Sequence, residues 1–145
     1  MKILDFLVCD DIRNEIGNKH SIMGLYDSSI EFQVTPENKN KWPKQLKICF
    51  FIRIFFEEQD EDQGFDSFTF TNKFGEHSSI LAEGSFSPTQ ISKSKKMILT
   101  IFSNSFTFDE AGEMGFIFEV HSKRSGETIK KDIEYLLTIK ETVLK

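Results

Sequence analysis

The stretch LKICFFIRIFF (residues 46–56) has a period of two, and this period decides the class of fold. In an extended chain successive side chains point to opposite faces, so the even-numbered residues from Leu46 to Phe56 form one apolar face. The opposite face mixes apolar and basic side chains: Lys47, Cys49, Phe51, Arg53 and Phe55. A strand that is apolar on both faces is typical of the centre of a sheet. We therefore predict a central strand that is covered on both sides over part of its length.

The same alternation recurs on the C-terminal side of this stretch, most clearly in FTFT (68–71) and FIFEV (116–120). Turn residues such as Gly17-Asn18 and Ser125-Gly126 separate many of the apolar runs. Many strands at near-regular spacing, without a long helical period, predict an all-β fold: a two-sheet antiparallel β-sandwich of jelly-roll or Ig-like type with about eight strands. The predicted strands lie near residues 2–13, 19–34, 45–56, 65–74, 78–86, 96–107, 115–123 and 128–140.

Two of these segments allow an alternative interpretation. Residues 19–34 form two strands if the chain breaks near Asp27. In residues 128–140, Ile129, Ile133 and Leu136 fit a helical spacing, but strand alternation fits more of the apolar residues, so we favour a closing hairpin. The alternation also predicts the following core residues: Ile12, Met23, Phe50, Ile52, Phe68, Phe70, Phe116 and Phe118.

Length, composition and charge predict one globular domain that spans residues 1–145. The chain contains 16 Phe residues, whose rings have no polar group and are expected in the core. Its 18 basic and 23 acidic residues are interleaved, which argues against a nucleic-acid partner. Because no apolar run approaches the ~20 residues of a membrane helix and no leader is present, we expect a cytoplasmic protein without membrane contact. Cys9 and Cys49 are expected to be buried reduced thiols, with an inter-strand disulfide as the alternative.

Gly17-Asn18 predicts a two-residue hairpin of type II′, in which Ile16 faces Lys19 and Ile12 faces Met23. In this register Asp10 lies on the core face, where it needs a hydrogen-bonding partner unless the strand bulges and turns it outward.

The same register places four polar residues on the opposite face of the hairpin: Asp11, Arg13, Glu15 and His20. They are either a recognition patch or acid–base group, or a solvated face with cross-strand ion pairs, and we favour the structural interpretation. Ile22, Gly24 and Tyr26 would share this face, so we expect it to be covered. Arg13 would then bridge Asp11 and Glu15.

The segment VCDDIR (8–13), followed by Glu15, Gly17, Lys19 and SIMGLY (21–26), resembles a family of small uncharacterised bacterial all-β proteins. The family pattern has the form CDDIR…E…GxK…S…MG(I/L)Y. LKICFFIR (46–53) is similar to the family's next strand, and Gly115–Glu119 with Gly126 to its C-terminal hairpin. The chain departs from the family at Asn18, where a second glycine is usual, and in the charged loop after Phe56. The resemblance implies an all-β fold, and it implies no activity and no functional residues.

A search for catalytic signatures identifies no candidate catalytic residue and no cofactor motif. The three histidines are far apart, and none has a second ligand at zinc spacing. Carboxylates are dense between residues 57 and 62, where Glu58, Asp60 and Asp62 are weak candidates for calcium ligands. The spacing matches no EF-hand, so we predict solvated acids and no metal site.

These observations favour a non-catalytic interaction domain that binds a protein partner, whose identity and oligomeric state the sequence leaves open. Trp42, in the loop of residues 35–44, is a candidate contact for that partner, although packing over an end of the sandwich is the favoured interpretation. The alternative is a jelly-roll module that binds a sugar or lipid, with calcium at residues 57–62.

Overall fold

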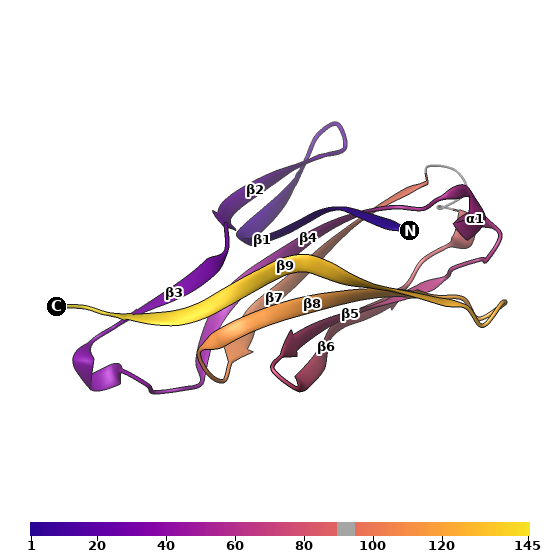
Figure 1. Cartoon of the computed structure of the whole chain (residues 1–145). Coiled ribbons are helices and arrows are strands. Elements are labelled where there is room, and N and C mark those ends of the chain that lie inside the picture. The colour runs from indigo at the N-terminus through magenta and orange to yellow at the C-terminus, as the bar shows by residue number, and fades with distance from the viewer. Residues whose placement is uncertain (90–94) are drawn as a thin grey trace.

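The computed structural model describes residues 1–89 and 95–145 (Figure 1), and this part of the chain is all-β, as predicted. Short helices lie between strands: η1, a 3-10 helix at Pro36–Asn38, and α1 at Glu58–Glu61. The predicted segment 19–34 divides after Tyr26, as one of the two interpretations anticipated. The strands are β1 (Lys2–Glu15), β2 (Lys19–Tyr26), β3 (Ser29–Val34), β4 (Lys44–Phe55), β5 (Ser67–Phe74), β6 (His77–Ser85), β7 (Lys96–Phe108), β8 (Gly112–His121) and β9 (Thr128–Val143).

The strands form two sheets. Sheet A has the order β2-β1-β4-β7, and sheet B has the order β3-β9-β8-β5-β6. β4 pairs with β1 along one edge and with β7 along the other, which confirms the prediction that residues 46–56 form a central strand. The closing hairpin is also confirmed, because β8 and β9 are antiparallel, with Val120 opposite Ile129.

The chain passes from sheet A to sheet B between β2 and β3. β3 joins the edge of sheet B beside β9 and runs parallel to it, with Ser29 opposite Thr138 and Val34 opposite Val143. The prediction of a wholly antiparallel fold is therefore wrong for this pair, whereas the other strand pairs described are antiparallel. The alternation of side chains cannot reveal such an exception, since it is the same in both directions of pairing.

Both sheets contribute to one apolar core. In sheet A the even-numbered residues of β4 point inward, and the ring of Phe50 reaches the rings of Phe70 on β5 and Phe116 on β8, at centroid distances of 5.2 and 5.6 Å. Met23 is half-exposed and lies outside the core, so this core prediction is wrong. Phe68 is half-buried against the core. The predicted core residues that are buried are Ile12, Phe50, Ile52, Phe70, Phe116 and Phe118.

A second, smaller apolar cluster covers part of the other face of sheet A, as expected for β4. It consists of Cys9, Ile12 and Cys49, with Ile22 and Phe51 packed against them. Cys9 and Cys49 lie opposite each other on β1 and β4, and both are fully buried free thiols. The Cys9 thiol donates to the carbonyl oxygen of Cys49 at 3.7 Å, and the Cys49 thiol donates to that of Asp10 at 3.6 Å.

Burial raises the pKa of the Cys9 thiol to about 11, and the neighbouring Cys49 adds to the effect. Because the thiolate is the reactive form, we expect Cys9 to resist iodoacetamide at pH 8 in the folded protein and to react readily in urea. Intact-mass spectrometry over time measures both rates. Modification of the folded protein as fast as a free thiol would contradict the buried, protonated state.

The β1–β2 hairpin is one residue out of the predicted register. Glu15 pairs with Lys19 across a three-residue loop, so Ile12 faces Ile22 and not Met23. Asn18 has a φ of 57°, next to 89° for Gly17. A type II′ turn has a positive φ only at its first central residue, so the left-handed conformation of Asn18 excludes the predicted turn.

Asp10 is exposed, so the prediction that it lies on the core face is wrong. Its carboxylate accepts a hydrogen bond of 2.5 Å from the hydroxyl of Tyr26, and the β1–β2 register continues across it without a bulge. Gly24 makes room for this contact, because a Cβ atom there would overlap the Asp10 carboxylate. Burial, together with the hydrogen bond to Asp10, raises the pKa of Tyr26 well above its ordinary value.

Candidate functional site

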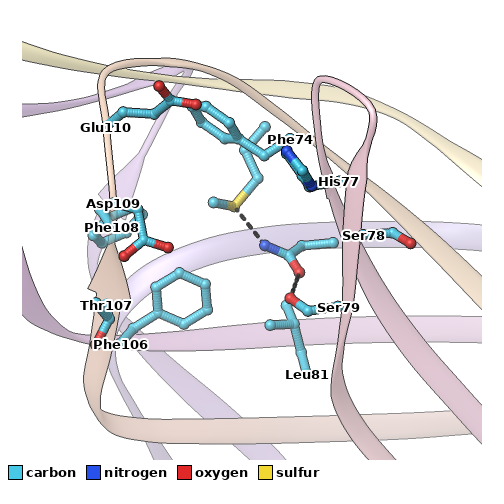
Figure 2. Close-up of a pocket in the computed structure, with 12 residues that line it drawn as sticks. Phe74, His77, Ser78, Ser79, Leu81, Phe106, Thr107, Phe108, Asp109 and Glu110 are labelled. Atoms are coloured by element: carbon cyan, nitrogen blue, oxygen red, sulfur yellow. Dashed lines mark hydrogen bonds between the residues drawn. The ribbon is translucent and has the colours of Figure 1, made fainter. Parts of the chain in front are cut away.

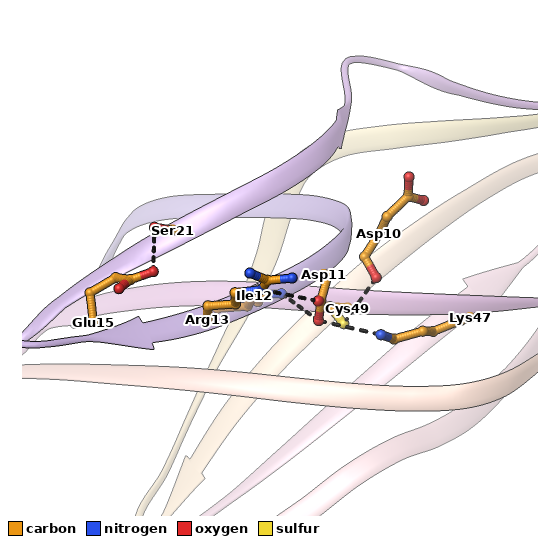
Figure 3. Close-up of polar contacts among 8 residues, drawn as sticks. All are labelled: Asp10, Asp11, Ile12, Arg13, Glu15, Ser21, Lys47 and Cys49. Atoms are coloured by element: carbon orange, nitrogen blue, oxygen red, sulfur yellow. Dashed lines mark hydrogen bonds and ion pairs between the residues drawn. The ribbon is translucent and has the colours of Figure 1, made fainter.

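The four polar residues predicted to form one cluster are divided among separate contacts, and Figure 3 shows those of Asp11, Arg13 and Glu15. Asp11 lies 3.3 Å from the ammonium group of Lys47 and 3.9 Å from the guanidinium group of Arg13. Glu15 accepts a hydrogen bond of 2.9 Å from Ser21. The ring of His20 packs edge-on against Phe51, at 5.4 Å between centroids. No convergent acid–base group results from these contacts.

The expectation that the face around Arg13 is covered is also wrong. The corrected register places Arg13 opposite Ser21 and not opposite Ile22, and its side chain is 66% exposed. It contacts Asp11, whereas Glu15 bonds to Ser21. The prediction of a covered bridge between two acids depended on the register and fails with it.

We therefore expect Arg13→Ala to change the free energy of unfolding by less than ~1 kcal/mol, because an exposed ion pair contributes little. Urea denaturation followed by circular dichroism measures this change. A loss of several kcal/mol would show that Arg13 has a structural contact that this geometry lacks.

The candidate calcium ligands contact groups within the chain. Asp60 is buried, and its carboxylate lies 2.7 Å from the amino group of Met1 and accepts a hydrogen bond of 2.8 Å from the backbone N–H of Glu57. Glu58 lies 3.8 Å from the ammonium group of Lys95. The third candidate, Asp62, follows α1 as its C-cap residue, and its carbonyl oxygen accepts a hydrogen bond from Arg124. In residues 1–89 and 95–145 no three His, Cys, Asp or Glu side chains form a group that could hold a metal ion.

Trp42 packs at one end of the two sheets. Its ring lies edge-on to that of Phe32 on β3 at 6.0 Å, and the ammonium group of Lys44 lies 5.0 Å from the Trp42 ring centroid. Its loop is also tied to β9, because Glu141 accepts hydrogen bonds of 3.0 and 3.1 Å from the backbone N–H of Asn40. This geometry matches the packing interpretation of Trp42.

A cavity of about 620 Å³ opens where the β5–β6 hairpin approaches the end of β7 (Figure 2). We call it the end cavity. Its walls come from three parts of the chain that are distant in sequence, namely β5 with the start of β6, the end of β7 with the following turn, and β8. The twelve lining residues are Asn72, Phe74, His77, Ser78, Ser79, Leu81, Phe106, Thr107, Phe108, Asp109, Glu110 and Met114.

The base of the end cavity is apolar except for one amide. Phe106, Phe108 and Met114 are buried, and Asn72 beside them is only 8% exposed. The amide oxygen of Asn72 accepts a hydrogen bond of 2.5 Å from the hydroxyl of Ser79. Its amide nitrogen points to the sulfur of Met114 at 3.6 Å, so this buried donor meets only a weak acceptor.

The charged groups of the end cavity are acidic. Asp109 and Glu110 enter it from the β7–β8 turn, as Figure 2 shows, and no Lys or Arg is among the lining residues. Within the part of the chain that the structure describes, neither carboxylate has a cationic partner within 4.0 Å. The cavity therefore combines aromatic walls with two carboxylates that have no counter-charge among the described residues.

Comparison with known proteins adds no family to this description. No family model matches the chain, and no curated protein or solved structure is similar to it. The resemblance to the bacterial family stays a prediction. Among the described helices, none combines the length and the apolar character that are needed to span a membrane.

Proposed function

We propose that the two sheets form a β-sandwich and that the protein is a non-catalytic binding domain, with the end cavity as its ligand site. The observation that carries the proposal is a cavity with a buried apolar base and a polar mouth. Ligand sites in proteins typically measure about 300–1,000 Å³ and combine apolar walls with a small number of polar groups. The end cavity, at about 620 Å³, is within this range.

The positions of the polar groups support binding. The buried Asn72 and the exposed Ser79 hold each other through a hydrogen bond of 2.5 Å. Such a fixed pair can orient a ligand without taking part in bond making. The alternative of a sugar- or lipid-binding module with calcium at residues 57–62 is not supported by the contacts of α1. The carboxylate of Asp60 contacts Met1, and that of Glu58 contacts Lys95.

The test is a binding screen followed by two-dimensional NMR of the ¹⁵N-labelled protein, with small amphipathic molecules that are neutral, cationic and anionic. We expect at least one of them to shift the amide signals of His77, Ser79 and Asp109 together. His77→Trp should abolish the response, because a bulky ring at this exposed position obstructs the mouth of the cavity.

Glu83→Trp is the matched control, since Glu83 is also exposed on β6 but does not line the cavity. It should leave the response unchanged. If no molecule shifts these signals, or if shifts persist in His77→Trp, the end cavity is not the ligand site.

A further inference from the structure

We infer that the end cavity binds an organic cation, namely an ammonium group carried on a short apolar chain. This inference rests on the proposed function and specifies the chemistry of its ligand. It follows from the charges of the cavity, from its aromatic walls and from the hydrogen-bonding capacity of its base, which are independent features of the same twelve lining residues.

The charges of the end cavity disfavour an anionic ligand and favour a cationic one. Asp109 and Glu110 line the cavity together without a Lys or Arg among the lining residues. An anionic ligand would meet two like charges at short range, whereas a cation would supply the counter-charge that neither carboxylate has in residues 1–89 and 95–145. The net charge of the whole chain, −5, also raises the local concentration of cations.

The walls suit a cation that carries apolar atoms. Phe74 and Phe106 line the cavity, and the ring of Phe106 packs against that of Phe108 at 4.8 Å between centroids. The face of an aromatic ring attracts a positive charge, and this attraction is greater where water is excluded. The apolar chain of such a ligand would also bury against Leu81 and Met114.

Asn72 and Ser79 offer acceptors to a ligand group that only donates hydrogen bonds. An ammonium group donates hydrogen bonds and accepts none. The oxygen atoms of Asn72 and Ser79 share one hydrogen bond, and each keeps lone-pair capacity for another donor. The amide nitrogen of Asn72, the donor that a carboxylate ligand would need from this pair, already points to the Met114 sulfur.

The experiment compares three probes of equal chain length by calorimetric or NMR titration at low salt: n-butylammonium, n-butanol and butyrate. We expect butylammonium to bind at least about tenfold more tightly than butanol, and butyrate not to bind. Added sodium chloride should weaken the binding of butylammonium, since salt screens the attraction between charges at the open mouth of the cavity.

A double variant isolates the contribution of the carboxylates. Asp109→Asn with Glu110→Gln should weaken the binding of butylammonium about tenfold and leave the binding of butanol unchanged. The matched control is Asp62→Asn with Glu127→Gln. It changes the net charge by the same amount, but its positions lie after α1 and in the β8–β9 turn, at the other end of the molecule (Figure 1). This control should bind butylammonium as the unaltered protein does.

The outcomes separate this inference from the proposed function. Equal binding of butanol and butylammonium, or preferred binding of butyrate, overturns the cation inference while the cavity remains a ligand site. Binding of none of the three probes, with no response in the fragment screen, overturns both. A lysine-containing tripeptide, added as a fourth probe, identifies the source of the cation. Tighter binding of the peptide than of butylammonium assigns the ammonium group to a protein side chain, and weaker binding assigns it to a small molecule.

Discussion

Replacing Phe50 with alanine is expected to lower the free energy of unfolding by about 3–5 kcal/mol. Phe50 lies in the middle of the central strand β4 and is 1% exposed. Its ring is surrounded by four others, at centroid distances between 5.2 and 6.3 Å: Phe6, Phe70, Phe106 and Phe116. Alanine would leave a cavity that touches both sheets, which cannot collapse without moving several aromatic rings.

Urea denaturation with linear extrapolation measures this loss. Phe102→Ala is the matched control, because Phe102 is on the neighbouring strand β7 but 52% exposed, and its loss should be much smaller. If Phe50→Ala does not fold, Phe50→Leu retains part of the volume and should still lose more stability than Phe102→Leu. Equal losses at both positions would contradict the assignment of the inner and outer faces of sheet A.

Asp60→Asn is expected to lower the free energy of unfolding by about 3–5 kcal/mol, the usual effect of removing one partner from a buried ion pair. Asp60 is 4% exposed, and its carboxylate binds both the Met1 amino group and the backbone N–H of Glu57. Asparagine keeps the shape of the side chain but leaves the positive charge of Met1 without a full counter-charge.

Glu58→Gln tests whether this effect belongs to the buried pair. Glu58 is on the same helix, and its side chain is 90% exposed, so the loss of its contact with Lys95 should change stability by less than ~1 kcal/mol. Thermal and urea denaturation of both variants give the comparison. A similar, small effect for Asp60→Asn would mean that the contact between Met1 and Asp60 does not contribute to stability.

Much of the fold follows from the period of two in the sequence. The alternation in residues 46–56 predicts both faces of β4 correctly, including the partial second cover at Cys49 and Phe51. The alternation is informative because both sheets bury apolar residues, and a strand with the wrong phase would expose them. The hairpin register fails because it depends on one backbone angle, the left-handed φ of Asn18, and each residue of error exchanges the two faces.

The end cavity could not be predicted from the sequence. Asn72, His77, Asp109 and Met114 have no common spacing or motif, and only the packing of three distant segments brings them together. A buried Asn in a strand of alternating Phe and Thr was the one available signal, since a buried amide needs a partner. Conversely, Asp11, Arg13, Glu15 and His20 are close in sequence but are held in separate contacts.

The parallel pairing of β3 with β9 has a consequence for the order in which the molecule assembles. β2 finds β1 within a short hairpin, but β3 must wait for the last strand of sheet B, because Ser29 pairs with Thr138. Contacts between residues so far apart slow folding, and domains dominated by them fold on the order of milliseconds to seconds. During synthesis on the ribosome, β3 therefore emerges long before its partner. Until β9 arrives, its apolar residues Ile30 and Phe32 are exposed to chaperones and to other nascent chains.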